Sequence, residues 1–121
     1  MKKIRVLTLG LVATALLVWA LPATAHTSAA KATVNVTAGK PSEFHFTLSA
    51  KSVKHGTVTF NVTNGGTIPH DFKINGKKTK LLSGGQSAKL TVTFAKAGKY
   101  PYLCTVTGHA VAGMKGTLTV T

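Results

Sequence analysis

Residues 100–114 read Tyr-Pro-Tyr-Leu-Cys-Thr-Val-Thr-Gly-His-Ala-Val-Ala-Gly-Met and carry three potential metal ligands in one short segment. Cys104, His109 and Met114 are evenly spaced, with four residues between each pair. Thiolate and thioether groups favour soft transition metals, and imidazole binds several of the same metals. The two tyrosines are typical of a strand, whereas Gly108 and Gly113 are typical of a loop. The segment therefore predicts a metal site in a loop that follows a strand.

A fourth ligand has to come from another part of the chain. Two histidines, one cysteine and a weak axial methionine form the ligand set of blue-copper electron-transfer sites. The best candidate for the second imidazole is His70, in the segment Thr-Ile-Pro-His-Asp-Phe at residues 67–72. This interpretation predicts that His70 and Cys104 lie close together in the folded protein.

Strand phase supports that pairing. His70 shares one strand face with Phe72 and Ile74, whereas Asp71 is expected on the opposite face. Cys104 shares a face with the two tyrosines of its segment, so both proposed ligands point inward. A histidine in phase with apolar residues is more often an ordinary interior histidine. An unpaired cysteine is most often a buried, inert thiol. Two inward donors beside a loop with His and Met favour the metal site over both alternatives.

The remaining sequence predicts an all-β domain. Apolar and polar residues alternate with a period of two in several segments, at residues 33–37, 44–48, 57–62, 88–94 and 117–120. Glycine-containing turns separate these segments, for example at residues 64–66 and 83–85. Several short strands with turns at this spacing are typical of a sandwich or barrel.

The first 25 residues have the pattern of a secretory signal peptide. A basic start at residues 1–5 precedes a 16-residue apolar run, and Ala23 and Ala25 then form a small-residue cleavage pattern. An uncleaved membrane anchor is the alternative, but a spanning helix needs about 20 residues. We therefore expect a signal helix in residues 1–25 that is cleaved after Ala25. Residues 26–121 are expected to form one domain, which is exported to the periplasm or the cell exterior and keeps no membrane span.

The charge of the chain predicts the kind of partner. The formal charge of +13 falls to +10 without Lys2, Lys3 and Arg5, and only Glu43 and Asp71 oppose the lysines that remain. The electrostatic field of such a positively charged protein steers association with acidic partners. Nucleic acid binding is disfavoured because residues 26–121 contain no arginine and no nucleic-acid motif.

The segments around His70 and around residues 100–120 together resemble the cupredoxins, the family of small blue copper proteins that includes plastocyanin and azurin. The resemblance covers essentially all of residues 26–121. It implies a Greek-key β-sandwich of about eight strands that holds one type 1 copper ion. The implied equatorial ligands are His70, Cys104 and His109, and the implied axial ligand is Met114. Four residues separate Cys104 from His109, as in azurins, whereas plastocyanins have two.

The resemblance also implies a function. A cupredoxin of this kind shuttles single electrons and is not an enzyme. The ring edge of His109 would be the electron port, within an apolar docking patch formed by Ala110, Val111 and Ala112. Asp71, where many relatives have Asn, and Thr105 would lie around the ligands and tune the site. The expected partners of the monomer are redox proteins with acidic docking surfaces, such as a cytochrome or a copper enzyme.

A second interpretation is copper delivery or homeostasis in the exported compartment. Cleavage after Ala25 would make His26 the new N-terminus, where the amine and the imidazole together can chelate copper. His26 is therefore a candidate for a weak second copper site, unless cleavage occurs nearer Ala30.

Overall fold

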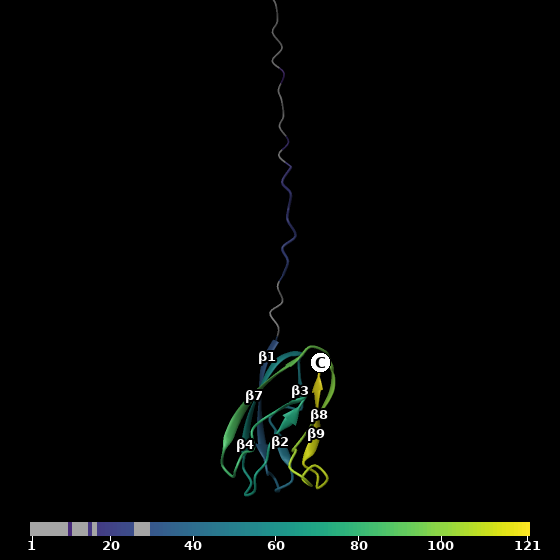
Figure 1. The fold of residues 1–121 in the computed structure, drawn as a ribbon. Helices are drawn as coiled ribbons and strands as arrows, with labels where there is room; N and C mark the ends of the chain where they lie inside the picture. The colour runs from purple at the N-terminus through teal and green to yellow at the C-terminus, as the bar shows by residue number, and fades with distance from the viewer. Residues whose placement is uncertain (1–9, 11–14, 16, 26–29) are drawn as a thin grey trace, which may run out of the picture.

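The protein is described by a computed structural model that covers residues 10, 15, 17–25 and 30–121. These residues form nine strands and no helix (Figure 1). The strands are β1 (Ala30–Ala38), β2 (Phe46–Leu48), β3 (Ser52–Val53), β4 (Gly56–Asn64), β5 (Lys73–Ile74), β6 (Lys77–Lys78), β7 (Ser87–Phe94), β8 (Gly98–Leu103) and β9 (Lys115–Val120). One sheet has the order β2-β1-β4-β7 and the other the order β3-β9-β8-β5-β6. The all-β sandwich expected from the sequence is confirmed, with nine strands instead of about eight.

The long strands β1, β4 and β7 form most of the four-stranded sheet. β1 runs parallel to β4, and β7 runs antiparallel to it. Val34 and Phe60 are partners in this register, and both side chains are fully buried. Threonine and asparagine alternate with these residues on the outer face. The period-two pattern thus places β-branched and aromatic residues against the second sheet.

Aromatic rings fill the space between the two sheets. Phe72 lies at the centre of this cluster, with its ring centroid 5.3 Å from those of Phe46 and Phe60 and 5.4 Å from that of Tyr102. Burial of one such ring stabilises the fold by roughly 1.5–3 kcal/mol. Because Phe72 is only two residues from His70, the packed core also holds the backbone that carries His70.

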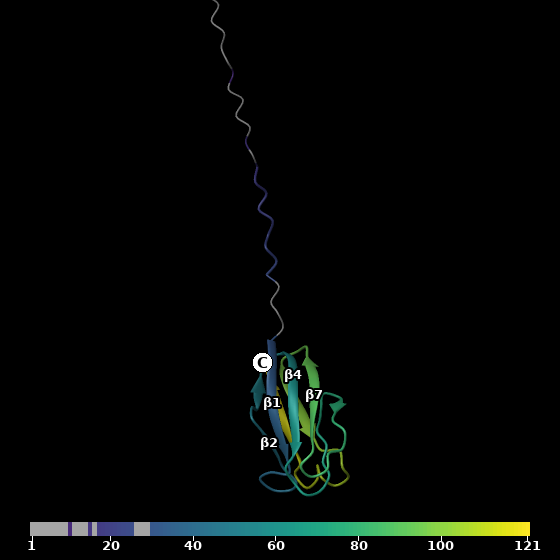
Figure 2. The same cartoon turned by 90° about the vertical axis from the view of Figure 1, so that its left-hand side faces the viewer.

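Four loops gather at one end of the sandwich, opposite the end where Ala30 and the C-terminus lie (Figures 1 and 2). They connect β1 to β2, β4 to β5, β6 to β7, and β8 to β9. His70 lies in the second loop, whereas Cys104, His109 and Met114 lie in the fourth. The fold therefore brings all four predicted ligands to the same end of the domain.

The strand predicted at residues 44–48 is shorter in the structure. β2 begins only at Phe46, because the preceding residues form a turn in which the Gly39 N–H donates to the His45 carbonyl at 2.8 Å. The His45 N–H donates in turn to the Ser42 carbonyl at 3.2 Å. This turn directs Glu43 and Phe44 toward the loop end of the sandwich.

The predicted signal helix lies mostly outside the described residues. Residues 10, 15 and 17–25 have no regular secondary structure, and Leu17, Val18, Trp19 and Leu21 are each at least 80% exposed. His26 also lies outside the described residues. In the part of the chain that the structure describes, no helix has the length and apolar character needed to span a membrane.

Candidate metal centre

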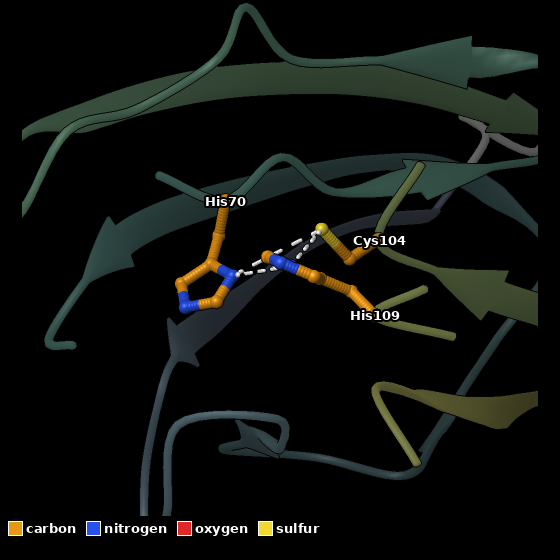
Figure 3. Close-up of side chains that lie close together, drawn as sticks. All are labelled: His70, Cys104 and His109. Atoms are coloured by element: carbon orange, nitrogen blue, oxygen red, sulfur yellow. Dashed lines mark hydrogen bonds between the residues drawn. The ribbon is translucent and has the colours of Figure 1, made fainter. Parts of the chain in front are cut away.

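Three potential ligands meet inside the loop end of the sandwich. Figure 3 shows the side chains of His70, Cys104 and His109 pointing toward one another. The two Nδ1 atoms are 3.1 Å apart, and the Cys104 Sγ lies 3.6 Å from His109 Nδ1 and 4.0 Å from His70 Nδ1. His70 and Cys104 are at most 1% exposed, and His109 is 9% exposed. The inward orientation predicted for His70 and Cys104 is what the structure shows.

Each ligand is held by its local backbone. His70 forms a β-bridge with Leu82, in which each N–H donates to the other carbonyl at 3.0 and 2.8 Å. Cys104 directly follows β8, and its N–H donates to the Met114 carbonyl at 3.1 Å. The Met114 N–H donates to the His109 carbonyl at 3.0 Å. These bonds fold the loop that carries Cys104, His109 and Met114 back on itself.

The three donor atoms fit a single metal ion. Imidazole and thiolate ligands of a first-row metal lie about 2.0–2.3 Å from it, so ligands of one ion are separated by roughly 3–4 Å. The observed separations of 3.1, 3.6 and 4.0 Å agree with this spacing. Two imidazole lone pairs that face each other in a buried site repel unless a cation or a proton lies between them. A thiolate with two imidazoles is a donor set that suits copper.

Met114 lies beside this trio. Its side chain is fully buried and forms a small cluster with Ala38 and Cys104, against which Phe44 and Phe46 pack. The sulfur of a buried methionine is a soft donor that suits copper. The structure therefore places the fourth predicted ligand next to the cysteine of the other three.

Asp71 is buried, in contrast to its expected place on the face opposite the core. It is 4% exposed, and its Oδ1 accepts the backbone N–H of Thr105 at 2.6 Å. Its Oδ2 also accepts the Thr105 hydroxyl. The strand alternation used for the prediction does not apply here, because β5 begins only at Lys73. The structure thus brings Asp71 and Thr105, the two residues expected around the ligands, into direct contact.

The surroundings of Cys104 act on its thiol in opposite directions. Burial raises the pKa of the Cys104 thiol above its ordinary value. Backbone N–H groups of Asp71 and Val106 donate to the sulfur and lower the same pKa, but by less. Groups that donate to a sulfur also stabilise a thiolate once a metal displaces the proton.

Glu43 is a site residue that the sequence interpretation missed. Its Oε1 lies 2.8 Å from His70 Nε2, on the side of the ring that faces away from Cys104 and His109. This hydrogen bond is the largest of the effects that lower the pKa of Glu43 to about 2. A signal was available in the composition, because Glu43 is one of only two acidic residues in a chain with a formal charge of +13.

His109 lies where the site approaches the surface. Its ring packs against Phe44, with the ring centroids 5.0 Å apart in an edge-to-face arrangement. Burial, followed by the nearby His70, lowers the pKa of His109. Ala110 is half-buried, Ala112 is exposed, and Val111 is 91% exposed. The residues of the predicted docking patch therefore directly follow, in the chain, the ligand that lies nearest to solvent.

Two curated proteins share local similarity with the chain. Auracyanin-B of Chloroflexus aurantiacus is 51% identical over 43 residues, which are 36% of this chain and 18% of that protein. The copper-resistant cuproprotein CopI of Pseudomonas aeruginosa is 50% identical over 40 residues, which are 33% of this chain and 22% of that protein. The matched segments thus span less than a quarter of either relative.

Solved structures agree over a larger part of the chain. A structure of auracyanin B aligns with a TM-score of 0.61 and 27% identity, and the alignment covers 78% of this chain and 91% of that one. Rusticyanin from Thiobacillus ferrooxidans aligns with a TM-score of 0.65 and 24% identity, over 78% of this chain and 79% of that one. The sequence model of the cupredoxin-like domain family matches residues 11–120. The chain therefore belongs to the cupredoxin-like family, and its buried donor set fits the single type 1 copper ion of that family.

Proposed function

We propose that the protein is an exported blue copper protein that carries single electrons between redox partners. The observation that carries this proposal is the buried convergence of His70 Nδ1, Cys104 Sγ and His109 Nδ1. His70, Cys104 and His109 would be the equatorial ligands, and Met114 the axial one. Bound copper supplies one-electron chemistry by alternating between Cu(II) and Cu(I).

The ligand types and the hydrogen bonds of the ligand loops suit this role. Imidazoles favour Cu(II), whereas thiolate and thioether favour Cu(I), so one compromise geometry serves both states. The β-bridge at His70 and the hydrogen bonds between Cys104, Met114 and His109 support such a fixed geometry. Little rearrangement is then needed when the ion changes its oxidation state.

Electron exchange is proposed to occur at His109. This ligand is the most exposed of the four, and the docking patch of Ala110, Val111 and Ala112 adjoins it. A contact through small apolar side chains lets a partner approach closely with little desolvation of polar groups. The lysine-rich surface would steer acidic redox proteins, such as a cytochrome or a copper enzyme, toward this monomer.

Export is part of the proposal. Residues 1–25 would act as a signal peptide and leave a domain of residues 26–121 in the periplasm or outside the cell. The exposure of Leu17, Val18, Trp19 and Leu21 supports this division, because these apolar side chains are not needed for the packed core.

An enzymatic role is not proposed. Oxidases with several copper ions need additional ligands, such as paired histidines one residue apart. The sequence has five histidines, none in a His-x-His pair, and a single cysteine. This ligand supply suits one copper ion and an electron carrier.

Copper delivery or homeostasis is the second candidate function. It is favoured by the local similarity to the copper-resistant cuproprotein CopI. In this role, His26 at the new N-terminus would provide a weak second copper site. A delivery protein has to release copper to an acceptor, whereas an electron carrier has to retain it through many redox cycles. Copper release to a competing chelator, measured in both oxidation states, separates the two functions.

The visible spectrum tests the proposed site. Addition of Cu(II) to protein lacking residues 1–25 should give intense visible absorption from charge transfer between thiolate and copper. Cys104→Ser should abolish this band and leave the β-sheet circular dichroism unchanged, because a hydroxyl cannot replace the thiolate. A Cys104→Ser variant that stays blue would falsify the assignment. In His70→Ala, added imidazole should restore the band by filling the vacated position.

A further inference from the structure

Both acidic residues of the chain lie at the metal centre. Twelve lysines are distributed over residues 26–121, yet Glu43 and Asp71 are the only carboxylate side chains. Asp71 binds Thr105, next to Cys104, and Glu43 binds His70. On a chain selected only for solubility, acids would be found elsewhere on the surface as well. The placement of Glu43 therefore points to a role at the site itself.

The carboxylate of Glu43 is fixed by groups that are not metal ligands. Its Oε1 accepts the N–H groups of Thr67 and Ile68 at 3.0 and 3.2 Å, and its Oε2 accepts the Thr67 hydroxyl at 3.2 Å. Gly66 makes this position accessible, because a Cβ at residue 66 would collide with the Glu43 carboxylate. Its position is thus set by the protein scaffold and does not depend on a bound metal.

This carboxylate determines which nitrogen of His70 carries the proton. An ionised carboxylate can only accept hydrogen bonds, so His70 Nε2 has to be the N–H that donates to Oε1 at 2.8 Å. In a neutral imidazole the other nitrogen then keeps its lone pair. That nitrogen is Nδ1, which faces Cys104 and His109. The hydrogen bond to Glu43 therefore presents His70 in its metal-binding tautomer.

We propose that Glu43 is a positioning residue that fixes the metal-binding tautomer of His70 and, through its negative charge, favours Cu(II) over Cu(I). This inference rests on the proposed function, because it assumes that His70 binds copper. A carboxylate partner makes an imidazole ligand more basic and stabilises the more positive state of the metal. Its effect opposes that of the surrounding lysines, which favour the less positive state.

Two variants separate this role from that of a simple loop contact. Glu43→Gln keeps the shape but brings an amide that can donate as well as accept. The Thr67 and Ile68 N–H groups and His70 Nε2 all contact Oε1, so the amide oxygen at that position still accepts from His70, and this variant removes only the negative charge. Gly66→Ala keeps the charge of Glu43 but displaces its carboxylate. Thr67→Val is the matched control, since it removes one hydroxyl donor to Glu43 and leaves the contact with His70 in place.

The first measurement uses the metal-free protein, and its decisive result comes from the parent. Nitrogen NMR of the His70 ring at neutral pH should show the Nε2–H tautomer in the parent and in Thr67→Val. Glu43→Gln should keep the Nε2–H form, whereas Gly66→Ala should shift the ring toward the Nδ1–H form, because the displaced carboxylate no longer accepts from Nε2. A parent ring with the proton on Nδ1 overturns the proposal, whether or not the variants fold.

The second measurement uses the copper-loaded protein. Loss of a hydrogen-bond partner of a metal ligand typically weakens metal binding 10–100-fold. Gly66→Ala should show a loss of Cu(II) affinity in this range, Glu43→Gln should show a higher reduction potential because its negative charge is gone, and Thr67→Val should match the parent. Unchanged Cu(II) affinity in Gly66→Ala together with an unchanged potential in Glu43→Gln would overturn the proposal and leave Glu43 with a purely structural role in its loop. Failure of the electron-carrier function would appear as slow electron exchange and would leave both of these measurements intact.

Discussion

Asp71 and Thr105 connect the two loops that supply the ligands. The Thr105 N–H donates to Asp71 Oδ1 at 2.6 Å, and the Thr105 hydroxyl donates to Oδ2. Asp71 directly follows His70, and Thr105 directly follows Cys104. The pair therefore fixes the backbone on both sides of the 4.0 Å separation between His70 Nδ1 and Cys104 Sγ.

Replacement of Asp71 should weaken this connection. Asp71→Ala should lower the free energy of unfolding of the metal-free protein by about 1.5–3 kcal/mol, the usual range for a hydrogen bond to a charged group. Thr105→Val keeps the hydrogen bond from the backbone N–H to Asp71 and loses only the one from the hydroxyl, so it should lower the free energy of unfolding by less than Asp71→Ala does. Urea denaturation of the parent and both variants measures the difference. Equal stability of Asp71→Ala and the parent would show that the pair does not hold the loops together.

Replacement of Met114 should change the reduction potential in a predictable direction. Met114→Leu removes the sulfur donor and should raise the potential, whereas Met114→Gln supplies a harder oxygen donor and should lower it. A shift of about 59 mV corresponds to a tenfold change in the relative stability of the two copper states.

Spectroelectrochemical titration of both variants provides the measurement. Leu is close to Met in volume, so Met114→Leu should lower the free energy of unfolding by less than about 1.5 kcal/mol. If both variants have the same reduction potential as the parent, Met114 is not a ligand of the copper ion.

The features predicted best from the sequence were those with a strong local pattern. The period-two alternation identified β1, β4, β7 and β9, because one face of each strand is buried. The metal-ligand types and their spacing pointed to the trio that the structure brings together. Strands β3, β5 and β6 have only two residues each, which is too short for any periodicity to be recognised.

The remaining features depend on contacts between distant loops. Glu43 was missed because the alternation at residues 44–48 suggested a continuous strand. The turn between Gly39 and His45 instead carries Glu43 toward His70, which is 27 residues away in the chain. Strand alternation predicts an outward-facing Asp71, which is wrong because His70 forms an isolated bridge with Leu82 and is not part of a regular strand. Local sequence rules cannot describe either arrangement.

Export should be visible in the mass of the protein isolated from its native compartment. Intact-mass spectrometry should show the loss of residues 1–25, which leaves His26 at the N-terminus. A mass that includes residues 1–21 would support the anchored alternative. A start after Ala29 or Ala30 would exclude His26 as a copper site and leave the four-ligand site unaffected.

Electron exchange with an acidic partner should depend on two separate surfaces. The lysines act over long range and are screened by salt, with a Debye length of about 10 Å at 0.1 M. Stopped-flow rates with an acidic redox protein should therefore fall as salt rises, and rates with a basic one should rise. Rates that do not change with salt concentration would show that the lysines do not guide association.

The docking patch acts at short range and should be insensitive to this screening. Val111→Asp should slow electron transfer to every partner at all salt concentrations, because the contact would have to desolvate a carboxylate beside His109. Val111 is 91% exposed, so the substitution removes no core packing and should leave the copper spectrum unchanged. Thr91→Asp makes a comparable charge change on the exposed face of β7, so it should alter only the salt-dependent part of the rate. If Val111→Asp and Thr91→Asp transfer electrons equally fast, the port does not lie at His109.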